Sequence, residues 1–339
     1  MNDANRRDFL KATAAGVTLA GLGASVLSAQ EDSSDGLPKR PLGKTGQMVS
    51  IICLGGWHIG AIEEKLAVNL MHQAIDEGIT FFDNAWDYHD GGSEEVMGKA
   101  LAQGGRRDKV FLMTKNCDRD RQGSMKHLEE SLRRLQTDHI DLWQFHEINY
   151  DNDPDWIFER GGMAAALEAK KAGKVRYIGF TGHKHPDIHL KMINKPHAWD
   201  TVQMPINIMD AHYRSFQKEV LPVCNERGIG VLGMKSLAGG HPKGRLADKA
   251  GLDAAACRRY ALSLPISSLV CGIISAKDLK QDVGVARGFK PLAQAELDKL
   301  LARTAAEGTD GRHELFKSTQ VFDGPYHQRQ HGFEPQVSG

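Results

Sequence analysis

Residues 78–115, GITFFDNAWDYHDGGSEEVMGKALAQGGRRDKVFLMTK, decide the fold class. The runs Ile79–Asp83 and Val110–Thr114 are short and rich in apolar and β-branched residues, which is typical of buried strands. Between them, residues 93–103 carry an amphipathic pattern at helical spacing. The stretch therefore predicts one strand–helix–strand unit of a parallel sheet.

The same alternation continues along the chain. Further strands are expected at Ile51–Leu54, Ile140–Phe145, Val175–Phe180, Thr201–Met204, Gly230–Gly233 and Ser268–Cys271, with helices near 64–77, 124–136, 162–173, 186–194, 215–227, 252–263 and 277–286. Eight such units predict an α/β fold, a (β/α)8 TIM barrel. The rival doubly wound dinucleotide fold would need G-x-G-x-x-G after its first strand, but residues 54–60, LGGWHIG, form only a loose glycine cluster.

Composition excludes several function classes. The 339 residues include 43 Lys and Arg against 43 Asp and Glu, and this zero net charge argues against binding to nucleic acid. Five cysteines are scattered without a C-x-x-C pair, so neither a zinc or redox motif nor a disulfide framework is expected.

The N-terminus has the order of an export signal. Residues 5–11, NRRDFLK, precede an apolar stretch at 12–27 and then small and polar residues. The paired arginines resemble a twin-arginine signal. We therefore expect a signal peptide at 1–30, a polar linker at 31–37, a barrel at 38–303 and a C-terminal tail over the barrel mouth at 304–339. The twin-arginine export machinery would deliver the protein to the periplasm. The apolar stretch is too short to predict a stable membrane span, although an uncleaved signal would tether the chain.

Barrel active sites lie at the C-terminal ends of the strands, where this sequence places Asp83, Tyr88, Lys115 and His146. In this context the chain resembles the aldo-keto reductase family, from about Leu42 to Gly284. The resemblance is carried by residues 78–98, 111–115 (FLMTK), 140–146 (IDLWQFH) and 174–179 (KVRYIG).

The resemblance implies a nicotinamide-dependent oxidoreductase acting on a small aldehyde, ketone or sugar. Tyr88 would be the general acid for reduction and the base for oxidation. Lys115 would lower the pKa of Tyr88, Asp83 would keep Lys115 charged and oriented, and His146 would hydrogen-bond the substrate oxygen or Tyr88.

The resemblance also implies a cofactor site. Thr181 and Gln203 match the positions that hold the nicotinamide carboxamide, and His183 either adds to that contact or is a plain loop residue. Gly272 and Asp278 stand where well-known members bring Lys and Arg to the 2′-phosphate. Asp278 would repel a phosphate, while Lys277 and Lys280 would partly restore attraction. The family resemblance favours NADP, with NAD as the alternative. The remaining candidates are Gly56, Trp57, Met234, Lys235, Ser236, Leu237, Gly239, Ser275, Gln281 and Asp282.

Trp57, Trp86 and His89, together with His58, are expected to line the substrate pocket. His313, His327 and His331 are expected to be solvated tail residues, and no metal site is predicted. Two alternatives remain open: an exported sugar oxidoreductase or epimerase-type enzyme that retains its nicotinamide tightly, and a non-enzymatic, cofactor-bound barrel that senses redox state.

Overall fold

The computed structural model describes residues 36–239 and 252–335. The expected signal peptide lies outside the described residues. A closed barrel of eight parallel strands, ordered β10-β3-β4-β5-β6-β7-β8-β9, confirms the predicted TIM barrel. The strands are β3 (Ile52–Gly55), β4 (Phe81–Asp83), β5 (Phe111–Asn116), β6 (Ile140–Phe145), β7 (Val175–Thr181), β8 (Thr201–Pro205), β9 (Gly230–Met234) and β10 (Ser268–Cys271).

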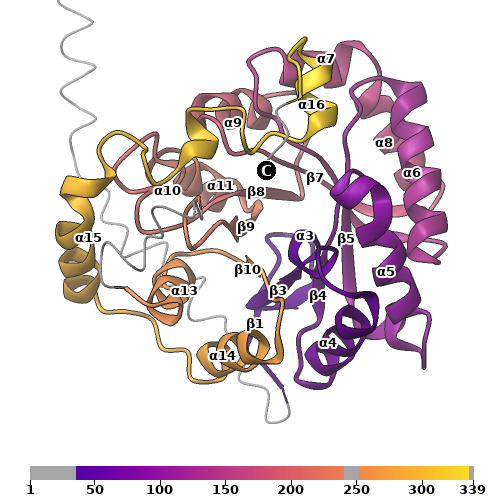
Figure 1. Ribbon diagram of the computed structural model, residues 1–339. Coiled ribbons are helices and arrows are strands. Elements are labelled where there is room, and N and C mark those ends of the chain that lie inside the picture. Colours follow the sequence, from indigo (N-terminus) through magenta and orange to yellow (C-terminus); the bar gives the residue numbers. More distant parts are fainter. Residues whose placement is uncertain (1–35, 240–251, 336–339) are drawn as a thin grey trace, which may run out of the picture.

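The predicted helices surround this barrel (Figure 1). They are α4 (Glu64–Asp76), α5 (Gly92–Leu101), α6 (Arg121–Leu135), α8 (Gly162–Lys171), α9 (Pro186–Ile193), α10 (Phe216–Glu219), α11 (Leu221–Arg227), α13 (Ala254–Leu262) and α14 (Ala276–Arg287). The single helix expected at 215–227 is two helices, because Pro222 in the first turn of α11 has no backbone N–H to continue the α10 ladder. None of the helices among the described residues is both long and apolar enough to span a membrane.

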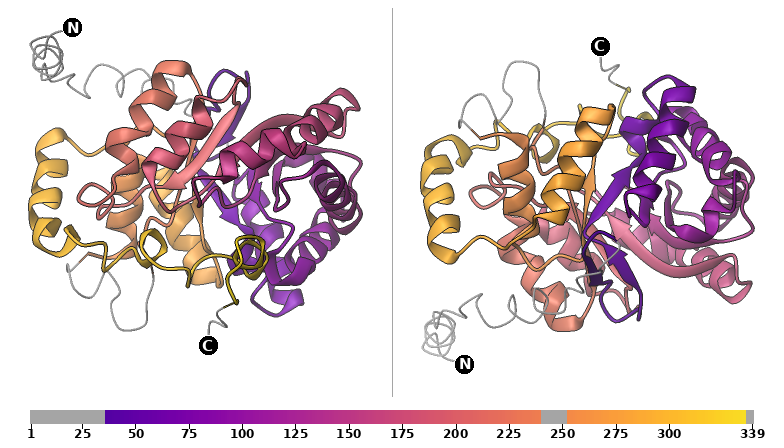
Figure 2. Two further views of the ribbon diagram at one scale, coloured as in Figure 1. Left: turned by 90° about the horizontal axis from the view of Figure 1, so that it is seen from above. Right: turned by 90° about the horizontal axis from the view of Figure 1, so that it is seen from below.

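The sequence pattern did not reveal several further elements. A hairpin of β1 (Lys39–Pro41) and β2 (Met48–Ser50) brings Leu42 and Val49 against side chains of the barrel interior. The others are α3 (Gly56–Ile59), α7 (Asp153–Glu159), α15 (Gln294–Gly308), α16 (Pro325–Gln330) and the 3-10 turns η1 (Tyr88–Gly91), η2 (Arg106–Lys109) and η3 (Leu315–Lys317). The expected barrel–tail boundary at 303/304 falls inside α15, which lies at the edge of the molecule (Figure 2).

Strand periodicity places the candidate site residues inside the barrel. Phe81, Phe111, Met113 and Leu142 belong to the interior cluster, whereas Phe82, Leu112 and Trp143 pack outward against the helices. Side chains alternate between the two faces along each strand, and we call the side chains of a strand that face the barrel interior its inward row. Asp83, Lys115 and His146 continue the inward rows at the C-terminal ends of β4, β5 and β6.

Candidate functional site

Lys115 is the centre of the predicted catalytic set. Its ammonium donates to Oδ1 of Asp83, to the carbonyl oxygen of Asn84 at 2.6 Å and to the Tyr88 hydroxyl at 3.4 Å. Asp83 and Lys115 are both buried, so their ion pair is shielded from water. Burial raises the pKa of Asp83, although the Lys115 ammonium opposes that rise. The structure thus brings three of the four predicted residues into direct contact.

The pKa of Tyr88 differs from the expectation that Lys115 lowers it. Burial raises the pKa of Tyr88 well above its ordinary value, and the carboxylates of Asp83, Asp87 and Glu147 raise it further. A buried phenolate would lose its hydration and be repelled by the neighbouring carboxylates, so its formation is disfavoured. The raised pKa favours the protonated phenol, whose oxygen accepts the Lys115 hydrogen bond in this structure.

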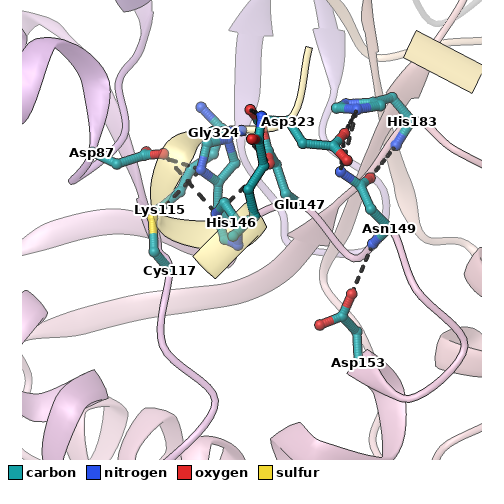
Figure 3. Close-up of polar contacts among 12 residues, drawn as sticks. Asp87, Lys115, Cys117, His146, Glu147, Asn149, Asp153, His183, Asp323 and Gly324 are labelled. Carbon is teal, nitrogen blue, oxygen red and sulfur yellow. Dashed lines mark hydrogen bonds and ion pairs between the residues drawn. The ribbon is translucent and has the colours of Figure 1, made fainter. Parts of the chain in front are cut away.

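His146 packs edge-on against Tyr88, with ring centroids 5.5 Å apart. Its Nδ1 lies 3.0 Å from Oδ1 of Asp87 and 3.6 Å from the Cys117 sulfur (Figure 3). Burial lowers the pKa of His146, while Asp87 opposes that shift. Asp87 and Cys117 thus join the predicted set, and neither was singled out from the sequence.

The C-terminal segment covers this end of the barrel. Asp323 lies 3.0 Å from Nε2 of His183 and accepts a hydrogen bond from Asn149 at 3.1 Å (Figure 3). It also accepts hydrogen bonds from Lys184 and from Tyr150, both at 2.8 Å. Burial lowers the pKa of His183 to about 4. The polar contacts of His183 therefore fasten the tail to the barrel.

The expectation that the tail histidines are solvated is wrong. His313 and His327 are buried, and His331 stacks on Trp156 while its Nε2 lies 3.1 Å from Asp153. The contacts of His331 join residues about 180 positions apart in the sequence. They link the end of α16 to α7, and these two helices lie side by side in Figure 1. Local sequence spacing cannot reveal such a contact.

The nicotinamide side of the predicted site has an unpaired acceptor. Thr181, Gln203 and Met234 follow the inward rows at the ends of β7, β8 and β9. Gln203 is buried, its Nε2 contacts the Met234 sulfur at 3.7 Å, and its Oε1 has no hydrogen-bond partner among the described residues. A buried amide oxygen of this kind suits a carboxamide N–H donor, so these residues fit a nicotinamide.

The phosphate side of the predicted site is organised by Arg258, which sequence reasoning missed. Its buried guanidinium donates to the Ser236 hydroxyl and pairs with Asp282 at 3.3 Å. The imidazole of His58 lies over Gly272, where an added Cβ would stand 2.5 Å from Nδ1. A side chain at this position would displace the His58 ring from its present place.

The other predicted cofactor residues either contact the protein itself or are exposed. The ammonium of Lys235 lies over the Phe316 ring at 5.2 Å, and the Gly239 amide donates to the His313 carbonyl. Ser275 caps α14 by accepting from the Asp278 amide. The side chains of Leu237, Lys277 and Gln281 are exposed, and Gly56 begins α3.

The predicted substrate residues separate into two groups. Trp57 is half exposed and lies against both Tyr88 and His89, with ring centroids 5.3 and 4.6 Å away. Trp86 instead stacks on His127 at 3.6 Å and donates to Glu130 at 2.7 Å, so its ring packs against α6. It also borders a pocket lined by Trp86, Asp87, Asp90, Arg134, Pro325, Tyr326 and Arg329.

Residues 51–272 match the model of the aldo/keto reductase family, which is well over half of the chain. The chain belongs to the aldo/keto reductase family. It is 36% identical over 231 residues to the uncharacterized oxidoreductase YrpG of Bacillus subtilis, covering 59% of this chain and 66% of that protein. It is 33% identical over 221 residues to the aldo-keto reductase YhdN of the same organism, covering 60% and 63%.

Among solved structures, the holo form of the aldo-keto reductase AKR11C1 from Bacillus halodurans superposes with a TM-score of 0.67 at 26% identity, covering 81% of this chain and 98% of that one. The chain spans slightly under two thirds of the length of the two curated relatives. In this aldo/keto reductase, Asp87, Cys117 and His327 lie close to His146. The first two stand beside Tyr88 and Lys115 in the sequence, whereas nothing in the sequence indicates His327.

Proposed function

We propose that this aldo/keto reductase transfers a hydride between NAD(P)(H) and a small carbonyl or alcohol substrate, with Tyr88 as the proton donor for reduction. The observation that carries the proposal is the buried contact of Lys115 with Asp83 and, at 3.4 Å, with the Tyr88 hydroxyl. The nicotinamide, when bound, supplies the hydride, and the unpaired oxygen of Gln203 supports its placement at the ends of β7 to β9.

The protein's own residues would supply the proton and position the substrate. Asp83 and the Asn84 carbonyl hold the Lys115 ammonium beside the phenol, which stabilises the phenolate left after proton transfer. The half-exposed Trp57 ring against Tyr88 offers an apolar wall for an aldehyde, a ketone or one face of a sugar.

The test is nucleotide consumption with a panel of aldehydes, ketones and aldoses. Tyr88→Phe should lower kcat by about 10²-fold or more, because general acid catalysis contributes on that scale. Tyr177→Phe is the matched control, since that hydroxyl donates to the Thr45 carbonyl outside the site. Nucleotide affinity, followed by tryptophan fluorescence, should stay unchanged in both variants. Full turnover in Tyr88→Phe would refute the assignment.

We further propose a preference for NADP over NAD. Lys277 and Lys280 are exposed in the first turns of α14, where cations would meet a 2′-phosphate. The Asp278 carboxylate accepts from the Ser275 hydroxyl at 2.8 Å and from the Ile274 amide at 3.3 Å, so part of its charge is already satisfied. Replacing both lysines by Ala should reduce the NADPH-to-NADH ratio of kcat/KM, and an unchanged ratio would exclude them.

We also propose that the chain is exported to the periplasm by the twin-arginine machinery. Support comes from the sequence of residues 5–30 and from five free, buried cysteines, which require no oxidative folding step. Exchange of Arg6 and Arg7 for Lys should leave the protein in the cytoplasmic fraction. An unchanged distribution between fractions would argue against this route.

A further inference from the structure

Four side chains with metal-binding atoms converge at the barrel mouth. Asp87, Cys117, His146 and His327 each offer one oxygen, sulfur or nitrogen atom, and these four atoms all lie within 4.8 Å of one another. We call this set the mouth cluster. Three members come from segments that follow β4, β5 and β6, and the fourth comes from α16, between 181 and 240 residues further along the chain. The fold alone assembles the cluster.

The separations suit a four-coordinate ion. His146 Nδ1 lies 3.0 Å from Asp87 Oδ1 and 3.6 Å from the Cys117 sulfur, and His327 Nε2 lies 4.0 Å from Asp87 Oδ2 (Figure 3 shows the first three residues). Tetrahedral zinc with bonds of 2.0–2.3 Å separates its ligand atoms by roughly 3.3–3.8 Å. Only small side-chain shifts would therefore place an ion among the four atoms.

His327 provides independent evidence for a missing partner. Its side chain is fully buried, and neither ring nitrogen has a hydrogen-bond partner among the described residues. Asp87 lies beside it in the cluster, and its Oδ1 is paired with Nδ1 of His146 at 3.0 Å. Buried polar atoms are almost always satisfied, so a buried imidazole that faces the cluster with neither nitrogen hydrogen-bonded points to a ligand that binds one of those nitrogens.

The surroundings hold the cluster in place. The buried guanidinium of Arg119 donates to the backbone carbonyls of Cys117 at 3.2 Å and His146 at 2.9 Å, and it pairs with Asp153 at 2.9 Å. Glu147 lies 3.9 Å from Nε2 of His327. Backbone segments fixed by such hydrogen bonds orient the side chains that ligate a metal.

We propose that the mouth cluster binds one Zn²⁺ ion that fastens α16 to the barrel beside Tyr88. One thiolate, two imidazoles and one carboxylate are ligands that zinc accepts, and four protein ligands are typical of a structural rather than a catalytic site. Binding displaces the Cys117 thiol proton to the solvent, and no redox step is involved. The proposal goes beyond the proposed function, because the ion needs neither nucleotide nor substrate.

The experiment uses the full chain, freed of metal by a chelator that is then removed. Zn²⁺ alone is added and bound metal is counted by elemental analysis, and Co²⁺ alone is added for absorption spectroscopy. We expect one ion per chain, a thiolate-to-cobalt charge-transfer band, and a higher melting temperature with Zn²⁺.

Cys117→Ser should remove the charge-transfer band, and His327→Gln should weaken binding by more than the roughly 10–100-fold cost of second-shell changes. Cys257→Ser and His313→Gln are matched controls, since both residues are buried outside the cluster, and they should bind like the parent. His327→Cys keeps a ligand at that place. The His327→Cys variant should retain zinc binding and strengthen the charge-transfer band. If His327→Gln loses binding and His327→Cys keeps it, the loss comes from the missing ligand and not from unfolding.

Substoichiometric binding would overturn the proposal, as would binding that Cys117→Ser and His327→Gln leave unchanged. The measurement is made without nucleotide or substrate. Zinc binding by an inactive protein would support the zinc site and refute the proposed function. Activity without zinc binding would do the reverse, so the two proposals are tested independently.

Discussion

The ion pair of Arg119 and Asp153 should be a main energetic support of the site. Both side chains are fully buried. The guanidinium donates to Asp153 at 2.9 Å and to the carbonyl oxygens of Cys117, His146 and Glu147 at 3.2, 2.9 and 3.0 Å. Replacing Arg119 by Met keeps much of the side-chain volume but removes all four hydrogen bonds.

The magnitude follows from the uncompensated charge. Removing one partner of a buried ion pair costs about 3–5 kcal/mol of unfolding free energy. Asp153→Asn should cost a similar amount, because it leaves the Arg119 charge without its counterion. In the double variant neither charge is present, so its cost should be about 2–3 kcal/mol less than the sum of the two single costs.

The assay is a double-mutant cycle of urea unfolding at neutral pH, with kcat measured on the same variants. We expect Arg119→Met to lower kcat even without urea, where the variant is still folded. The reason is that the Arg119 guanidinium holds the backbone that carries His146. Additive costs, within about 0.5 kcal/mol, would show that the pair is not energetically coupled and would refute this reasoning.

Two further predictions concern stability. Glu314 and Asp210 share the buried ammonium of Lys317 at 2.8 and 2.7 Å, and burial raises the pKa of Glu314 to about 7. Because this carboxyl pKa is higher in the folded state, stability should fall as pH rises from about 4.5 to 7, by at most about 3 kcal/mol. Glu314→Gln should flatten that dependence in urea unfolding at several pH values, and an unchanged slope would exclude Glu314 as its source. Gly98→Ala should lose about 1–3 kcal/mol, since its Cβ would lie 2.1 Å from a backbone oxygen of α6. The control Gly284→Ala, with nothing within 4 Å, should gain up to about 1 kcal/mol by thermal unfolding, and equal effects in the two variants would contradict the packing argument.

The barrel and its inward rows could be predicted because both follow from local periodicity. Apolar runs with turns between them specify strands, and the two-residue alternation then fixes which side chains face inward. Asp83 and Lys115 occupy such inward positions at strand ends, and His146 follows directly after one. Their approach to Tyr88 was therefore expected from the sequence.

The pKa of Tyr88 could not be predicted from local periodicity. The sequence indicates that Lys115 lies near Tyr88, but the pKa of that phenol depends on how many carboxylates share its buried surroundings. Asp87 and Glu147 join Asp83 there only because the segments that follow β4 and β6 turn toward each other. The orientation of Trp86 likewise depends on His127 and Glu130, which lie on a helix that follows the next strand.

The sequence by itself determined the barrel, the strand ends that carry chemistry and the family to which the chain belongs. Only the tertiary structure decided what covers the barrel mouth. Asp323 reaches His183 across 140 residues, and His327 reaches Asp87 across 240. Neither contact follows a local period, because the residues that face the tail come from separate strands and meet only once the barrel has closed.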